Sequence, residues 1–264
     1  MGYFNVTVKP TIPASLQHAA SFSAQDVLFD WVSFDIPKGG ARLIGATILV
    51  RPKGNAGPTS NNFGCFLLFS KSDNTSLGTV NSGADNAPSN EFIGMVEFED
   101  ATSYAAVTPS TSVGVSGRAS NNSNQHPSIV FARDYDQDTA ALHADGAGAN
   151  VGYDRFYMGG IAEGDFDFTS INAIAEAGDA EAASTQVITM DGTSMDVREH
   201  FIDGDVVHIG TSVGTPAADS LIGTVASADS ATQITLDDVS ATALVDGDIL
   251  YNIHPIRVIL HFEQ

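Results

Sequence analysis

Hydrophobic and polar residues alternate most clearly between Val27 and Val50, and the predicted fold is organised around this stretch. Its first half places apolar side chains on one face at a period of two. These side chains are Leu28, Val32, Phe34 and Ile36. Pro37 to Gly40 supplies turn residues, and Leu43 to Val50 is apolar on both faces, as in a central strand. The pattern predicts two strands joined by a tight connection and forming a core pair.

Similar patterns predict further strands at both ends of the chain and between them. Residues 3–9 alternate until Pro10, and Ile256 to Phe262 alternates again, so we expect the last strand to return to the first sheet. Shorter strands are predicted at 65–69, 92–98, 113–115, 129–131 and 155–158. Residues 11–26 are interpreted as a polar connection. Residues 71–90 are interpreted as a long loop, which we expect to have a role because loops of this length are uncommon in compact domains.

The segment 176–252 contains an internal repeat. Thr185 to Asp191 resembles Thr232 to Asp237, and Ile202 to Val207 resembles Val245 to Leu250. Each copy indicates a strand, a link, an Asp-Gly turn and another strand, with a fifth strand at Leu221–Val225. Five short strands suggest a small barrel, because closure removes exposed edges. A short helix is predicted at 194–201, with Ser194 as its cap.

These elements predict an all-β protein: a β-sandwich, jelly-roll-like, with an inserted small β-barrel-like module. Residues 1–175 plus 253–264 form the predicted sandwich domain, and residues 176–252 form the inserted module. The chain has 264 residues, enough for one large β domain or two unequal domains.

Charge is distributed unevenly along the chain. Residues 1–133 carry 8 Lys/Arg and 9 Asp/Glu, a net of −1, whereas residues 134–264 carry 3 Lys/Arg and 23 Asp/Glu, a net of −20. Such a surface repels phosphates and anionic lipid, so neither nucleic acid nor membrane is an expected partner. No signal pattern and no membrane-length apolar run is present, and we expect a soluble protein. The asymmetry favours a near-neutral side packed on a partner and an acidic side facing solvent.

One acidic stretch is a candidate calcium loop. Asp134, Asp136 and Asp138 occupy positions 1, 3 and 5 of such a loop, and Asp145 occupies position 12. The pattern also requires Gly at position 6, where Thr139 stands, and Glu at position 12. Chance alternation in so acidic a half accounts for the match, so we predict no cofactor, with calcium as the alternative.

Other candidate groups favour structural roles. Asp203-Gly204-Asp205 and Asp246-Gly247-Asp248 offer paired carboxylates, but Asp-Gly before a β-branched run is typical of a strand-entry turn. The seven histidines show no metal-ligand spacing, and no nucleophile or phosphate-binding motif selects catalytic residues. Cys65 is interpreted as a buried small hydrophobe, and Trp31 as part of a two-sided core strand rather than an exposed platform. We predict no enzyme.

A resemblance adds a functional expectation. One set of segments is Phe34 to Ala41, Phe69 to Lys71 and Ser76 to Asn81. The other set is Gly204 to Ile209, Ile222 to Val225, Thr232 to Leu236 and Asp246 to Tyr251. These segments resemble virion structural proteins of tailed bacteriophages, particularly those of marine bacteria. The resemblance implies a β-rich, non-enzymatic particle protein, and head decoration (cement) proteins, often trimeric, belong to that group.

The first hypothesis is therefore a capsid decoration protein that stabilises the head by binding the capsid lattice and associating with itself, as a trimer. Its partners would be the major capsid protein or other virion proteins, and its location the capsid surface, after assembly in the host cytoplasm. A tail, baseplate or fibre component is the second hypothesis. The third is a carbohydrate-binding or carbohydrate-active jelly-roll protein, which requires converging carboxylates in a groove or the calcium site.

Overall fold

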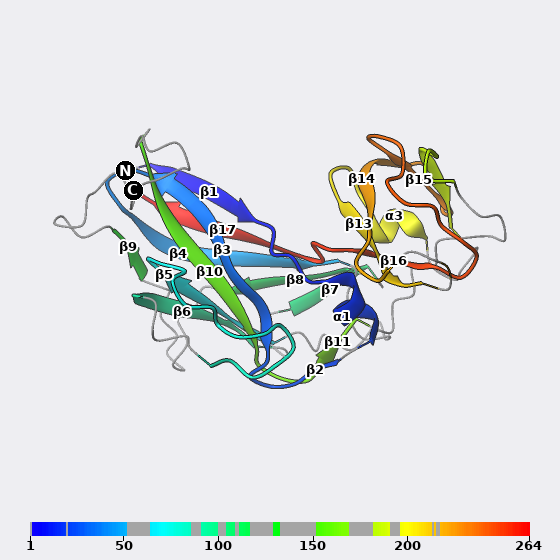
Figure 1. Ribbon diagram of the computed structural model, residues 1–264. Coiled ribbons are helices and arrows are strands. Elements are labelled where there is room, and N and C mark those ends of the chain that lie inside the picture. Colours follow the sequence, from blue (N-terminus) through cyan, green and yellow to red (C-terminus); the bar gives the residue numbers. More distant parts are fainter. Residues whose placement is uncertain are drawn as a thin grey trace.

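The computed structural model describes residues 2–19, 21–51, 64–85, 91–99, 104–108, 111–116, 129–132, 152–168, 182–190, 196–212, 214 and 217–264. These residues form a β-sandwich and a smaller β module beside it (Figure 1). The sandwich accounts for both ends of the chain, which lie together at the end away from the module. The protein is therefore all-β with antiparallel sheets, as predicted.

Two facing sheets build the sandwich. The first has the order β1-β17-β4-β8-β7, with β9 also paired to β4. Its strands are β1 (Tyr3–Val8), β17 (Ile256–Glu263), β4 (Ala41–Val50), β8 (Thr111–Ser116), β7 (Tyr104–Thr108) and β9 (Ile129–Phe131). The second has the order β3-β10-β5-β6. Its strands are β3 (Val27–Pro37), β10 (Tyr153–Ala162), β5 (Cys65–Ser70) and β6 (Phe92–Phe98). The last strand, β17, lies between β1 and β4, so the expected return to the sheet of residues 3–9 is observed.

The two strands of the organising stretch, β3 and β4, lie in opposite sheets and do not pair with each other. Their connection crosses from one sheet to the other through Gly39 and Gly40, which have φ of +108° and +84°. Glycine adopts this left-handed region without the Cβ penalty of other residues. The predicted core pair is thus a pair across the core, with both strands contributing inward side chains.

Aromatic rings fill the space between the sheets. Phe131 lies at the centre of this core, with its ring 5.8 Å from Phe34, 5.2 Å from Phe69 and 5.3 Å from both Phe156 and Phe262. The interplanar angles range from 65° to 88°, the edge-to-face geometry that aromatic quadrupoles favour. Cys65 is buried in the same core, as predicted.

The segment 11–26 is more than the polar connection that the sequence suggested. It contains the helix α1 (Ala14–Ala19) and the strand β2 (Ser21–Phe22), which pairs with β11 (Phe166–Asp167). Ile12 and Phe22 are fully buried. A six-residue helix is too short to show a hydrophobic period, and this is why the pattern missed it.

The segment 71–85 packs over the outer face of the four-stranded sheet. Main-chain bonds of 2.8 Å join Val27 to Asn81 and Ser82, and the Leu77 N–H donates to an Asp30 carboxylate oxygen at 2.9 Å. The Trp31 indole N–H donates to the Thr75 carbonyl at 2.9 Å. Trp31 is consequently half-buried under this segment, in agreement with the two-sided core strand.

The module is a five-stranded sheet with the order β12-β15-β14-β13-β16. Its strands are β12 (Val187–Thr189), β15 (Gln233–Leu236), β14 (Leu221–Ala228), β13 (Val206–Thr211) and β16 (Ile249–Asn252). It has a hydrophobic core of its own, drawn from residues 188–250. Within the described residues, β12 and β16 are not paired, so the sheet has an open order. The domain boundary predicted at 175–176 falls outside the described residues.

The short helix α3 (Val197–His200) begins two residues later than predicted. Its N-cap is Asp196, whose carboxylate accepts from the Arg198 N–H at 3.0 Å. Ser194, the predicted cap, lies outside the described residues and cannot cap a helix that starts at Val197. Aspartate and serine are both strong N-caps, and the prediction of Ser194 was wrong because Asp196 offered an equally good cap two residues later.

The repeat gives the module an internal two-fold pattern. Equivalent residues of the two copies pair directly: Ile188 with Ile234 in the β12–β15 ladder, and His208 with Tyr251 in the β13–β16 ladder. In an antiparallel ladder, a two-fold axis passes through such a pair of equivalent residues. The internal repeat is thus a repeat of structure as well as of sequence.

Candidate functional site

A buried charge cluster joins the module to the sandwich. Asp205, at the start of β13, is fully buried, and its two carboxylate oxygens accept from the guanidinium groups of Arg51 and Arg257. Arg51 follows β4 and Arg257 lies on β17, so both cations come from neighbouring strands of the sandwich. Burial lowers the pKa of the Arg51 guanidinium, Asp205 raises it, and the nearby Arg257 lowers it further.

The turn that carries Asp205 is repeated at Asp248. Asp205 accepts from the Ile202 N–H, and Asp248 accepts from the Val245 N–H, each at 2.9 Å. The glycines within the two turns, Gly204 and Gly247, have φ of +78° and +89°. Both copies are therefore strand-entry turns held by the second aspartate, which confirms the turn interpretation. In the first copy, the carboxylate of Asp205 also accepts from two arginines of the sandwich.

His200 lies close to this cluster and is 2% exposed. Neither of its ring nitrogens has a hydrogen-bond partner among the described residues. Burial, and then the charge of Arg51, lower the pKa of His200 to about 4, while Asp196 acts weakly in the opposite direction. The imidazole is consequently neutral near pH 7, the state in which an unpaired buried ring costs least.

The helix α1 forms a second contact between the two parts. It packs against β13 and β16, where Ser15 donates to Asp219 from its N–H at 2.9 Å and from its hydroxyl at 2.5 Å. The buried amide of Gln17 donates to the carbonyls of Ile12 and Asn252 at 2.9 and 2.8 Å. Together with the charge cluster, α1 fixes the module against the sandwich.

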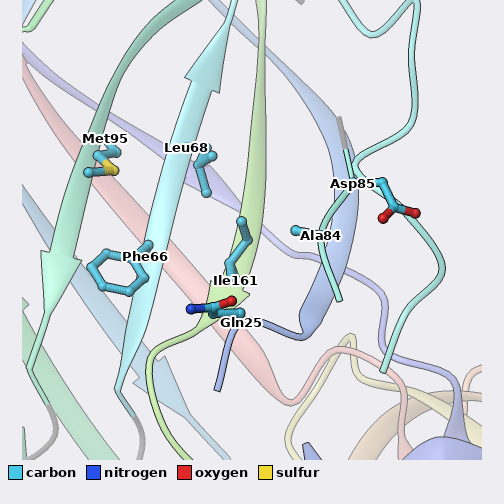
Figure 2. Close-up of a pocket in the computed structure, with 7 residues that line it drawn as sticks. All are labelled: Gln25, Phe66, Leu68, Ala84, Asp85, Met95 and Ile161. Atoms are coloured by element: carbon cyan, nitrogen blue, oxygen red, sulfur yellow. The ribbon is translucent and has the colours of Figure 1, made fainter. Parts of the chain in front are cut away.

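A pocket of about 330 Å³ lies on the outer face of the four-stranded sheet, beneath the segment 71–85 (Figure 2). Its floor consists of apolar side chains from three adjacent strands. These are Phe66, Leu68, Met95 and Ile161. Gln25, Ala84 and Asp85 complete the lining, and Asp85 is the one charged residue in it. The size suits a small apolar group, and such a lining favours binding over proton transfer.

The predicted calcium ligands Asp134, Asp136, Asp138 and Asp145 all fall outside the described residues, so the structure does not bear on that loop. In the part of the chain that is described, no group of three or more His, Cys, Asp or Glu side chains is placed to hold a metal ion. Trp31 does not line the pocket, and Asp85 is the one carboxylate in its lining, so the converging carboxylates required by a carbohydrate-active protein are not gathered there. Within the same residues, no helix has the length and apolar character needed to cross a membrane.

Sequence reasoning missed the cation partners of Asp205. The chain contains 11 Lys/Arg among 264 residues. Arg51 follows β4 and Arg257 lies near the start of β17, and a basic residue near the end of a strand does not by its type alone indicate a buried ion pair. Arg51 directly follows the mostly apolar run from Leu43 to Val50, and this position was the one signal of a buried ion pair that the sequence offered. The pocket could not be predicted from the sequence. Its floor is the outward face of strands, and apolar residues on both faces of a strand also fit a strand that is buried on both sides.

Comparison with known proteins gives no relative. No model of a protein family matches the chain, and no curated protein matches it. The fold and the sites described above therefore define the class: an all-β protein with two hydrophobic cores, joined by a buried Arg–Asp–Arg cluster and bearing an apolar pocket.

Proposed function

We propose that this chain is a structural component of a virus particle, a decoration protein that binds the outside of a capsid lattice. In this role the sandwich forms the base on the shell and the acidic module faces solvent. The protein acts by buried contact area and has no turnover. Self-association, as a trimer, would let each copy share a local symmetry axis of the shell.

The strand order of the sandwich is the observation that carries the proposal. Numbered along the chain, its eight principal strands are β1, β3, β4, β5, β6, β8, β10 and β17. In this numbering the two sheets have the orders 1-8-3-6 and 2-7-4-5. We interpret these orders as those of a jelly roll, the two-sheet fold of many viral capsid and lectin domains. This support is an analogy between folds, and the same fold also hosts other functions.

The distribution of charge is consistent with an outward-facing module. Residues 176–252 contain 14 Asp/Glu and 1 Lys/Arg, so two such modules on neighbouring copies would repel each other. The sandwich is close to neutral in the first half of the chain and can approach a shell or another copy at lower cost. The Arg51–Asp205–Arg257 cluster would hold the acidic part in a fixed direction relative to that base.

Cryo-electron microscopy of particles from the phage lysate in which the chain is made tests this role. We expect density for the sandwich on the outer capsid surface, and particles lacking the chain should keep their shape but rupture at lower temperature or osmotic stress. Density in the tail or baseplate would favour the second hypothesis instead. A chain found only in the soluble fraction, with intact and equally stable particles, would refute both.

Carbohydrate binding is the alternative of another class, because lectins share the jelly-roll strand order. The pocket beneath residues 71–85 is the described place where a sugar ring could stack, although its one charged residue is Asp85. Titration calorimetry with calcium, followed by screening on a glycan array in the presence of calcium, separates the two hypotheses. Binding that disappears with Leu68→Arg, a change in the pocket floor, would favour the lectin.

A further inference from the structure

Among the described residues, the strand β1 forms an open edge of the six-stranded sheet and pairs with β17 alone. Gly2 and Gln264, just beyond the paired residues, exchange both main-chain hydrogen bonds at 2.9 Å. Hydrogen-bonded and non-hydrogen-bonded pairs alternate along an antiparallel ladder. Phe4, Val6 and Val8 therefore bond to β17. The N–H and C=O groups of the intervening residues point away from the sheet.

Those outward groups belong to Tyr3, Asn5 and Thr7. None of their main-chain groups is hydrogen-bonded to another described residue. Natural edge strands are commonly blunted by a charge, a proline or a bulge. Between Tyr3 and Val8 there is no charged residue or proline, and the ladder with β17 has no register shift. The edge is a regular template for another strand.

Charge indicates which molecule fits this edge. The chain has a net charge of −21, so a second copy approaches most surfaces against repulsion. β1 has no carboxylate, and the residue that follows it is Lys9. Two copies that meet along β1 therefore bring together a segment that is neutral to slightly basic. For an acidic molecule, this is a place where copies meet at low electrostatic cost.

We propose that β1 pairs antiparallel with β1 of a second copy, around a two-fold axis at Asn5. In this register Asn5 faces its own equivalent, and Tyr3 faces Thr7 of the other chain. All the outward N–H and C=O groups are then used, because each of these is a hydrogen-bonded pair. The contact is two-fold, so it is separate from the trimer contact and does not depend on the proposed function.

The side chains of the core face support the same register. Phe4 and Val6 are only half-buried in the single chain, and the Phe4 ring stacks on Phe262 at 5.2 Å. With the two-fold axis at Asn5, Phe4 lies opposite Val6 of the second copy in a non-hydrogen-bonded pair, where side chains approach most closely. The two cores become continuous across the new sheet, and apolar surface at the edge is covered.

Disulfide trapping tests the register. Cys65 is fully buried, so a cysteine introduced on β1 is the accessible thiol. Asn5→Cys places two thiols across the axis, with Cα atoms about 5.5 Å apart, within the range of a disulfide. A mixture of Tyr3→Cys and Thr7→Cys should give the mixed dimer. Each of these alone should not, because equivalent residues are then four positions out of register, about 14 Å apart along the strand at ~3.4 Å per residue.

The expected result is a covalent dimer for Asn5→Cys and for the mixture, and at least tenfold less for Tyr3→Cys or Thr7→Cys alone. Equal trapping in every variant indicates random collision and overturns the proposal. So does the absence of any dimer from Asn5→Cys under mild oxidation at high protein concentration.

A proline variant gives a second test on the protein without cysteines on β1. Thr7→Pro removes an N–H that points away from β17, and an outward-facing edge position tolerates proline. Sedimentation equilibrium should show a concentration-dependent dimer for the wild type and Thr7→Ala, and its loss for Thr7→Pro. If Thr7→Pro does not fold, Asn5→Glu, compared with Asn5→Gln, places two carboxylates on the axis. Loss of the dimer in Asn5→Glu alone supports the pairing, and a dimer in both overturns it.

Discussion

Replacing His200 with leucine should remove a large part of the loss of stability at acid pH. The ring is 2% exposed and neither nitrogen is hydrogen-bonded to a described residue, so the protonated form is strongly disfavoured in the folded state. The pKa of His200 is lowered from 6.5 to about 4, mainly by burial. Leucine fills a similar apolar space and has no proton to bind.

The sign and size follow from linkage. Between pH 6.5 and 4 the unfolded chain binds a proton at this histidine and the folded chain does not, so stability is fully present above pH 6.5 and falls as the pH decreases. One pKa unit corresponds to about 1.4 kcal/mol, and the wild type therefore loses about 3 kcal/mol by pH 4 through His200. Below pH 4 both states are protonated and no further loss arises from this group.

Urea unfolding at intervals from pH 7 to pH 4, followed by far-UV circular dichroism, measures this difference. Hydrogen exchange of peptides from residues 201–211 assigns it to the module. Carboxylates also titrate near pH 4, and for that reason the quantity of interest is the difference between wild type and His200→Leu. This difference should grow by about 3 kcal/mol from pH 7 to pH 4.

Phe201→Leu is the matched control, because Phe201 follows His200, is 1% exposed and does not titrate. It should lower stability by nearly the same amount at every pH and keep the wild-type slope. If His200→Leu runs parallel to the wild type over the whole range, the ring is not held neutral by burial, and the reasoning fails.

Two further changes test the junction and the core. Asp205→Asn leaves Arg51 and Arg257 without their carboxylate and should lower the free energy of unfolding in urea by about 3–5 kcal/mol. The triple change Arg51→Met, Asp205→Leu and Arg257→Met should lower it by less, and a triple variant that is at least as unstable would contradict this. Gly160→Ala would place its Cβ 2.3 Å from a buried phenylalanine ring and should cost about 1–3 kcal/mol. Gly164→Ala, which has open space around it, should leave the melting temperature nearly unchanged, and equal effects of the two would refute the packing argument.

The local pattern predicted strands well and their pairing less well. The period of two before Pro37 identified the first strand and its inward face, and the apolar run from Leu43 to Val50 identified the second strand, because both patterns depend on neighbouring residues only. Placement of β3 and β4 in opposite sheets depends on their partners β10 and β17, which are far along the chain. A short turn can join two paired strands of a hairpin or two strands in opposite sheets of a sandwich. Gly39 and Gly40 are compatible with both and do not distinguish them.

The candidate site was less predictable for the same reason. Asp205 and Arg51 are 154 positions apart, and no periodicity links them. The Asp-Gly turns were recognised because their bonds close within three residues, from Ile202 to Asp205 and from Val245 to Asp248. Hydrogen bonds between residues that are close in the sequence can be predicted from it. The ion pairs that the same Asp205 carboxylate forms with distant arginines cannot.

The module is attached where its two copies differ. Tyr251 and His208 are equivalent in the repeat, yet Tyr251 is buried against α1, whereas His208 is half-exposed and its Nδ1 lies 2.7 Å from the Asp219 carbonyl oxygen. The close approach of Tyr251 requires Gly210, since a Cβ there would lie 2.5 Å from the tyrosine ring and 3.1 Å from the Ala14 carbonyl oxygen. A symmetric module presents two equivalent faces and has no preferred side. Differences at these positions, together with the arginines that bind Asp205, give the module one side that contacts the sandwich.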